Sequence, residues 1–249
     1  MVEWLERKGN DGLKAKTLYD YGKVIERMIT PAFGHLRLAD LSPVLVQPWQ
    51  DALAKRADDR GATMAAYAHR VLRAALNDAV RLGQIPMNPA ARARPAQRSR
   101  RKRPGFTLEE ANALFATAVG ARIEPLLRFA FYSGLRRGEA LGLQWADLNE
   151  AEGTITVRRN RVDVGGTIVT TTPKTAQSVR TISLPASALE ALRMQREQQE
   201  RDRAAGADPW NPDGWIFAST RGTPLDPADV ARSFRAVRKR ALVRQLPNV

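Results

Sequence analysis

The sequence predicts an α+β protein that is mainly helical and carries a small three-stranded antiparallel sheet in its second half. Three observations support this prediction. Apolar residues recur at helical spacing up to Leu82, alternate with polar residues between Thr154 and Leu184, and return to helical spacing after Pro185. The 249 residues are enough for two domains with separate cores.

The first part of the chain is expected to form four helices joined by short loops, which together make a small bundle. In the second helix Leu18, Tyr21 and Ile25 recur at helical spacing. Pro31 and Gly34 are expected to end that helix. The four helices are expected over about 2–8, from Thr17, after Ser42 as an N-cap, and over about 62–82 with Gly83 as the stop.

A basic run separates the two parts of the chain. It lies between Pro95 and Pro104, and such a run of like charges cannot bury itself, so residues 97–105 are expected to be an exposed linker. Two interpretations stay open: a solvated tether without a specific role, or a tether that also lies along DNA phosphates. The basic residues of this linker segment are Arg98, Arg100, Arg101, Lys102 and Arg103.

The second part is expected to mix helices and strands. Thr107 with Glu110 three residues later has the spacing of a capping box at a helix start. A buried helix through Phe129 and Phe131 then reaches Gly134. The elements expected after it are a short helix over 136–143, strands over 154–158, 168–172 and 179–184, a turn at Gly165–Gly166 between the first two strands, and helices over about 185–203 and 227–243.

The charge of the chain favours a nucleic acid as its partner. Lys and Arg number 40 against 26 Asp and Glu, which leaves a formal net charge of +14. Cations that neutralise phosphates release counterions, so a polyanion is the first partner to consider. The alternative is a basic surface that serves only solubility or ribosomal packing.

The composition also excludes several classes of site. Cysteine is absent, so disulfides and thiolate metal sites are excluded. The only histidines, His35 and His69, are too far apart in sequence to indicate a zinc site, so no metal is expected. The N-terminus contains no long apolar run, which predicts neither a signal peptide nor a membrane span and favours a cytoplasmic protein.

Arg136 and Glu139 are the first candidate site residues. Gly134 allows a sharp turn, so Arg136 can enter the first turn of a new helix, where its guanidinium suits a phosphate. Glu139 lies on the same helix face and can hold that guanidinium in place. From the residues alone, an ordinary surface Arg–Glu pair at a helix start explains the same pattern.

The segment 131–148, FYSGLRRGEALGLQWADL, is similar to the first catalytic box of the tyrosine recombinases. The resemblance aligns Arg136 with the arginine that grips the scissile phosphate and Glu139 with its acidic partner. A second segment, TPKTAQSVRTISLP, resembles the family's β-hairpin motif and aligns Lys174 with the lysine that protonates the departing 5′ oxygen. Ser178 and Arg180 complete this motif and are interpreted as structural or phosphate-binding residues.

The helical first part resembles the SAM-like core-binding domain of phage integrases. The similarity includes the segment from Leu13 to Tyr21, the Pro31 and Phe33–Gly34 positions, and the Asn88–Pro89 pair. The resemblance implies a core-binding domain over 1–96 and a partial catalytic domain over 106–249, which would clamp a DNA duplex between them. It also makes Lys14, Lys16 and Lys23 candidate phosphate contacts.

The resemblance stops before the end of the family's pattern. Family members use a C-terminal nucleophilic tyrosine and a His-x-x-Arg box, whereas here no Tyr follows Tyr132 and no His follows His69. Tyr132 lies within an apolar helix and is interpreted as core, and the other tyrosines belong to the bundle. The final RQLPNV indicates a truncation, so we expect no strand cleavage and a destabilised second domain.

The family implies a reaction and a set of partners. The complete enzyme would cut and rejoin DNA through a 3′-phosphotyrosine intermediate, without a metal or nucleotide cofactor, as a homo-tetramer on attachment or inverted-repeat sites. Accessory DNA-bending proteins are further possible partners. Two other hypotheses stay open: a non-catalytic DNA-binding protein that occupies recombination sites, and a generic basic scaffold for RNA or DNA.

Overall fold

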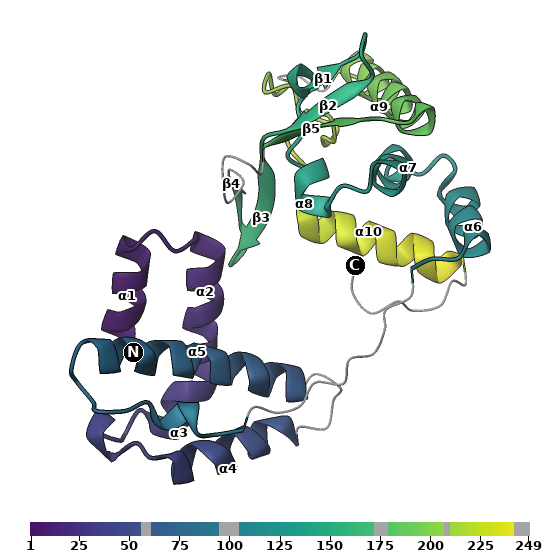
Figure 1. The fold of residues 1–249 in the computed structure, drawn as a ribbon. Coiled ribbons are helices and arrows are strands. Elements are labelled where there is room, and N and C mark those ends of the chain that lie inside the picture. Colours follow the sequence, from purple (N-terminus) through teal and green to yellow (C-terminus); the bar gives the residue numbers. More distant parts are fainter. Residues whose placement is uncertain (56–60, 95–104, 172–178, 207–209, 242–249) are drawn as a thin grey trace. The chain divides into compact units, whose positions relative to one another are not determined.

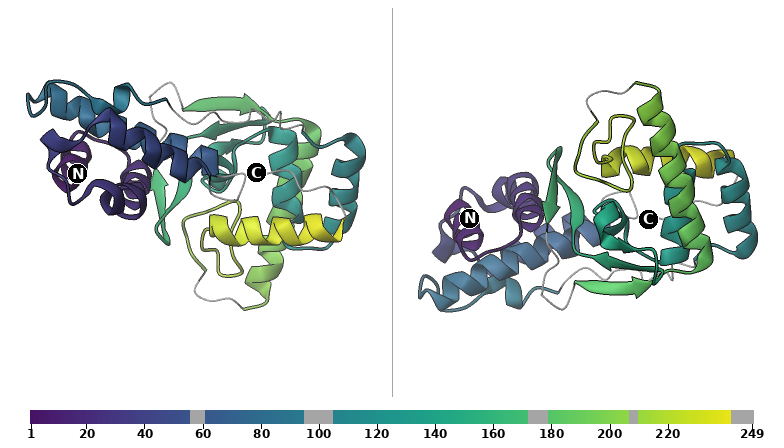
Figure 2. Two further views of the ribbon diagram at one scale, coloured as in Figure 1. Left: turned by 90° about the horizontal axis from the view of Figure 1, so that it is seen from below. Right: turned by 90° about the horizontal axis from the view of Figure 1, so that it is seen from above.

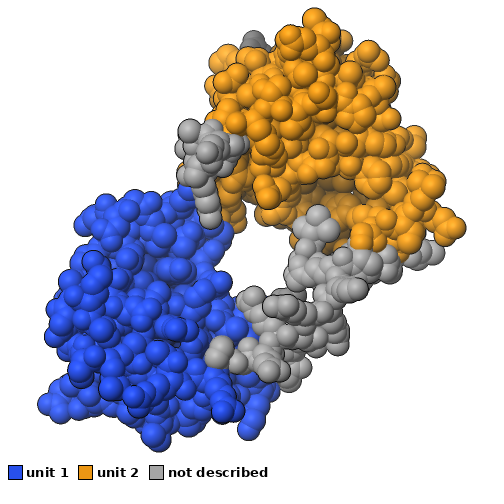
Figure 3. All heavy atoms as spheres, in the orientation of Figure 1, with its two compact units in different colours: residues 1–102 blue, residues 103–249 orange. Residues whose placement is uncertain are grey.

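The structure is a computed structural model that describes residues 1–55, 61–94, 105–171, 179–206 and 210–241. The chain forms two compact units, Met1–Lys102 and Arg103–Val249 (Figure 3). Within the described residues the first unit is helical, and the second combines helices with two small antiparallel sheets (Figures 1 and 2). The predicted fold class, mainly α with a small three-stranded antiparallel sheet, is confirmed.

The first unit is built from the predicted helices, with one correction. The second helix does not end at Pro31, because Pro31 lies in the first turn of α3, where a missing N–H costs nothing. Gly34 does end it, donating its N–H to the carbonyl of Thr30. The helices are α1 (Val2–Asn10), α2 (Ala15–Val24), the π-helix η1 (Ile25–Ile29), α3 (Thr30–Phe33), α4 (Pro43–Ala54) and α5 (Gly61–Arg81), with 3-10 turns η2 (Leu38–Asp40) and η3 (Pro89–Ala91).

The helix α5 is the centre of the first core. It buries Ala68, Val71, Leu72 and Leu76 against α2, η1 and α4. Its periodic apolar face accounts for this packing, since residues three and four apart share one side of a helix. The expected N-cap residue Ser42 does precede α4, but its side chain makes no capping hydrogen bond.

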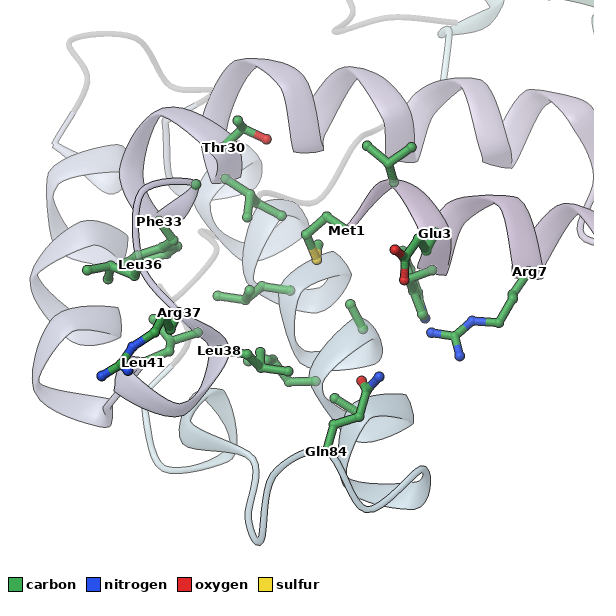
Figure 4. A pocket seen from close by; sticks show the side chains of 18 residues that line it. Met1, Glu3, Arg7, Thr30, Phe33, Leu36, Arg37, Leu38, Leu41 and Gln84 are labelled. Carbon is green, nitrogen blue, oxygen red and sulfur yellow. The ribbon is translucent and has the colours of Figure 1, made fainter.

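A hollow of about 440 Å³ opens between α1, α3 and α5 in the first unit (Figure 4). Its lining is mostly apolar and includes Met1, Phe33 and Leu38, with Arg7 and Arg37 among the polar residues. None of the lysines predicted from the sequence to contact DNA lines this hollow. It therefore lies apart from the predicted phosphate contacts of this unit.

The helices of the second unit begin and end close to the expected positions. The capping box is present: Thr107 Oγ1 accepts from the Glu110 N–H at 3.2 Å, and Glu110 accepts from the Thr107 N–H at 2.8 Å. The described helices are α6 (Leu108–Ala118), α7 (Glu124–Ser133), α8 (Arg137–Ala140), α9 (Ala186–Ala204) and α10 (Pro227–Arg240), with the 3-10 turn η4 (Trp145–Asp147).

The strands pair differently from the expectation. A three-stranded sheet exists, but the predicted strand over 168–172 is not part of it. That strand pairs instead with a strand that sequence reasoning missed, and Gly165–Gly166 is the turn between these two. The sheets are β1–β2–β5, formed by Leu148–Asn149, Thr154–Val157 and Arg180–Ser183, and β3–β4, formed by Asn160–Val164 and Thr167–Thr171.

The core of the second unit lies between the three-stranded sheet, α7 and α9, and α9 lies alongside α7 (Figures 1 and 2). Phe129, Leu141, Ile155 and Phe217 are almost completely buried there. Ile155 and Val157 face this core because alternate residues of a strand point to the same side.

Two aromatic residues expected in the core are exposed. Phe131 and Tyr132 keep 48% and 37% of their surface accessible, so the interpretation of Tyr132 as core is wrong. Both rings pack against Phe115 of α6, with ring centroids 5.1 and 5.8 Å from it. The α7 helix buries its opposite side, which carries Phe129, so these two positions face outward.

An open apolar groove of about 330 Å³ lies between α6, α7 and α10. Its lining includes Phe106, Leu127, Phe131 and Phe234. Exposed apolar surface of this kind is costly in water, because burial of such side chains is what stabilises a domain. The apolar side chains that line this groove on α6, α7 and α10 are therefore only partly buried in the second unit.

Candidate phosphate-binding site

The turn that ends α7 positions Arg136. Gly134 has φ 65°, a left-handed conformation that favours glycine, and it reverses the chain after Ser133. Arg136 follows in an extended conformation as the N-cap residue of α8. Because α8 has only four residues, its helix end contributes little to anion binding, and the site depends on side chains.

The carboxylate of Glu139 binds two arginines at once. Its Oε1 lies 3.2 Å from Arg136 Nη1, and its Oε2 accepts from the Arg136 backbone N–H at 3.0 Å. Arg180 donates to the same carboxylate through both Nη atoms, at 3.1 and 3.0 Å. Such paired bonds are directional as well as strong. Glu139 thereby brings two cations from distant parts of the sequence together.

The charges of this cluster are unequally exposed. The Glu139 side chain is 11% accessible, whereas that of Arg180 is 39% and that of Arg136 is 83% accessible. Burial raises the pKa of Glu139, but hydrogen bonds from Arg180 and Arg136 outweigh it and leave that pKa below its ordinary value. The buried anion holds its two partners while the Arg136 guanidinium stays available to an external anion.

Strand pairing explains how Arg180 reaches the site. Arg180 begins β5 and lies opposite Val157 of β2, next to a hydroxyl pair between Thr156 and Thr181 at 2.9 Å. Its hydrogen bond to Glu139 raises the pKa of the Arg180 guanidinium, which keeps it charged. Sequence reasoning placed Arg180 among the DNA contacts and did not anticipate its bond to Glu139.

A second charged cluster contacts the segment that follows α8. The Asp147 side chain is 3% accessible and lies 2.6 Å from Arg159 Nη2 and 3.3 Å from Arg158 Nε. Arg159 also donates through Nε to the carbonyl of Gly142 at 3.2 Å. Sequence reasoning missed this cluster. Its signal was the Asp of the Leu-x-Trp-x-Asp-Leu motif followed by two arginines at the end of a strand.

Profiles of two families match the chain. The Phage integrase family matches residues 106–247, and the N-terminal SAM-like domain of phage integrases matches residues 1–54. The first match alone covers more than half of the chain. This chain belongs to the phage integrase family.

Individual integrases show the same relationship. The chain is 27% identical over 249 residues to an integrase of Streptomyces ambofaciens, covering 96% of this chain and 62% of that protein. It is 38% identical over 122 residues to the prophage integrase IntR of Escherichia coli strain K12, covering 48% of this chain and 28% of that protein. This chain thus spans less than two thirds of the length of either relative.

Solved structures confirm the fold. A lambda integrase tetramer bound to a Holliday junction matches with a TM-score of 0.73 at 21% identity, covering 99% of this chain and 64% of that one. The Tn1549 transposon integrase in complex with transposon right end DNA matches with a TM-score of 0.81 at 18% identity, covering 96% and 76%. At these identities the likeness concerns the fold.

The lysines predicted to contact DNA in the first unit lie on or beside α2. Lys14 is the N-cap residue of α2. Lys16 pairs with Asp20 at 2.6 Å and Lys23 with Glu26 at 2.9 Å, and both pairs are solvent-accessible. Such surface pairs contribute little energy, so the lysines can exchange these partners for phosphates. Their role in binding DNA stays a prediction.

Several predicted site residues lie outside the described residues. These are Lys174 and Ser178 and the linker residues Arg98, Arg100, Arg101, Lys102 and Arg103. The strands on either side of Lys174 are not partners, since β4 pairs with β3 and β5 with β2. The expected hairpin between the second and third predicted strands is therefore wrong as a pairing, and the convergence of Arg136 and Lys174 on one phosphate stays a prediction.

The described residues lack two kinds of feature. In the described ranges, no group of three or more His, Asp or Glu side chains is arranged to hold a metal ion. Among the helices that the structure describes, none is long and apolar enough to span a lipid bilayer.

Proposed function

We propose that this chain is the DNA-binding portion of a site-specific tyrosine recombinase of the phage-integrase type, acting in the cytoplasm. The observation that carries the proposal is the Arg136–Glu139–Arg180 cluster. A buried carboxylate orients a guanidinium that is 83% accessible, at the motif by which the chain resembles these enzymes. The net charge of +14 supplies the long-range attraction to a duplex.

In the complete enzyme the chemistry would be in-line attack on a DNA phosphate. A tyrosine would attack phosphorus, and Arg136 would stabilise the charge of the pentacoordinate transition state. Lys174 would protonate the 5′ oxygen as it departs. The phosphodiester energy would be retained in a 3′-phosphotyrosine bond, so the reaction needs neither a metal nor a nucleotide.

The partners follow from the same proposal. The related structures include a lambda integrase tetramer on a Holliday junction and Tn1549 integrase bound to transposon DNA. We propose double-stranded DNA with an attachment or inverted-repeat site as the substrate. The complete enzyme would assemble on it as a homo-tetramer, with accessory DNA-bending proteins where the site must be bent.

The DNA-binding part of the proposal is tested by replacing Arg136. We expect R136A to bind a fluorescein-labelled duplex severalfold more weakly and to lower the slope of log affinity against log salt by about one. The matched control is R137A, because Arg137 is the adjacent exposed arginine and makes no ion pair with Glu139 in the described structure. Equal losses in the two variants would show a generic basic surface instead of an oriented site.

The cleavage part of the proposal makes a separate prediction. Since no Tyr follows Tyr132, we expect this chain to form no covalent complex on a nicked suicide substrate. Denaturing gel electrophoresis of the labelled DNA measures this directly. A covalent protein–DNA band would contradict the prediction and would require another nucleophile.

The second candidate function is a non-catalytic protein that occupies recombination sites. It requires only cationic features that this chain carries, namely the net charge of +14 and the exposed guanidinium of Arg136. Adding the C-terminal segment of an integrase relative, in cis or in trans, distinguishes the two. Restored strand cleavage supports the recombinase, whereas site-specific binding without cleavage supports the second candidate.

A further inference from the structure

We infer that Arg159 is a positioning residue for the phosphate-binding arginine, acting on Arg136 through α8. This inference rests on the function proposed above, in which Arg136 grips a DNA phosphate. The helix that must be positioned is short: α8 has four residues, fewer than a helix needs to be stable by itself. Its place is therefore set by the groups that contact it.

The guanidinium of Arg159 joins two points on the segment that follows α8. Its Nε donates to the carbonyl oxygen of Gly142 at 3.2 Å, and its Nη2 lies 2.6 Å from Asp147 Oδ2. Gly142 in turn donates its N–H to the carbonyl of Glu139 at 3.0 Å. The planar guanidinium holds its donors in one fixed geometry and so sets both distances at once, whereas the three donors of an ammonium have no such fixed fork.

Burial makes this contact difficult to replace. The Asp147 carboxylate is 3% accessible and also accepts from the Gln144 N–H at 2.9 Å. An ionised carboxylate this deeply buried requires a charged partner. Arg159 is 23% accessible and close, whereas Arg158 is 54% accessible and lies 3.3 Å away, so Arg159 is the stronger partner.

The backbone beside Arg159 is also in contact with α8. A Cβ atom on Gly142 would lie 2.8 Å from the carbonyl oxygen of Arg159, and one on Gly138 would lie 2.6 Å from that of Arg161. Both positions therefore require glycine, because any side chain would displace the helix. Glu139 lies between Gly138 and Gly142 in the sequence. The position of α8 against this backbone therefore determines where Glu139 holds the Arg136 guanidinium.

The test is a double-mutant cycle on the full chain. The affinity for a fluorescein-labelled DNA duplex is measured across a salt series for R136A, R159A and the double variant. We expect R159A to reproduce most of the R136A loss, including a slope reduced by about one, and the double variant to lose little beyond R136A. G142A should behave like R159A, because its Cβ would push against the same backbone.

Arg158 provides the matched control, since it is the adjacent arginine on the same carboxylate but has no bond to Gly142 in the described structure. Any loss of DNA affinity caused by R158A should be additive with the loss caused by R136A. Two outcomes overturn the inference. In one, the losses of DNA affinity in R159A and R136A are additive. In the other, the loss in R158A is as non-additive with that of R136A as the loss in R159A is. If R136A itself changes nothing, the proposed function fails, which is a different result.

Folding is monitored by circular dichroism for each variant. Should R159A fail to fold, R159K takes its place, because a lysine can pair with Asp147 but lacks the Nε–H that Arg159 donates to Gly142. R159K is then expected to give the same non-additive loss. Wild-type binding by R159K would overturn the inference.

Discussion

At the scale of residues, the chemistry of the candidate site depends on one carboxylate. Glu139 is 11% accessible and binds the exposed Arg136 and the half-exposed Arg180. Arg136 needs this anchor because an unrestrained arginine side chain must lose rotamer freedom when it binds a phosphate. A buried anion beside a cationic site thus favours phosphate binding by holding its cations in position.

The lowered pKa of Glu139 leads to a prediction about stability. Because its pKa in the folded chain is below the ordinary value of 4.5, the ionised form stabilises the fold above that pH, and this contribution disappears as the pH falls through the folded pKa. We expect E139Q to cost about 1–3 kcal/mol at neutral pH, since it removes charge-assisted hydrogen bonds.

The free energy of unfolding of wild-type and E139Q chains, measured by urea denaturation across pH, checks this prediction. The difference between the two should shrink in acid and vanish once Glu139 is protonated in the folded wild type. E139D, which keeps the charge, is the control. A difference that stays constant into acid would show that packing, and not ionisation, accounts for the effect.

At the scale of elements, local signals were predictable from the sequence and partner choices were not. The capping box of Thr107 and Glu110 was predicted because its residues are three apart and bind each other. The pairing of β4 with β3 was missed because Asn160–Val164 has only two apolar residues, Val162 and Val164, which is a short alternation beside charged residues. Tertiary packing determines which strands pair, and the sequence of a single segment does not contain that information.

The candidate site shows the same division. Arg136 and Glu139 were predicted from their spacing and from the family motif, and the structure places them together. The bond from Arg180 to Glu139 spans 41 residues and depends on the pairing of β2 with β5, so no local pattern contains it. Tyr132 was misplaced because an apolar run does not show which helix side faces the core.

At the scale of the whole molecule, the two units are expected to differ in stability. The first unit buries Ala68 and Val71 of α5 completely, and its hollow of about 440 Å³ has the charged Arg7 and Arg37 in its lining. The second leaves a groove of about 330 Å³ open between α6, α7 and α10, with Phe131 at 48% exposure. Local opening is easier where fewer apolar contacts must be broken.

Limited digestion with thermolysin, which cleaves beside apolar residues, should therefore remove the second unit first and leave a fragment of the first. The dye ANS, which binds exposed apolar surface, should bind in the same groove. F131Q should reduce this dye binding without disturbing the buried Phe129. The corresponding control on the first unit is V44Q, because Val44 is 78% exposed and lies outside the groove. The prediction is contradicted if the two units resist thermolysin equally and F131Q leaves dye binding unchanged. That result would mean that the groove does not limit the stability of the second unit.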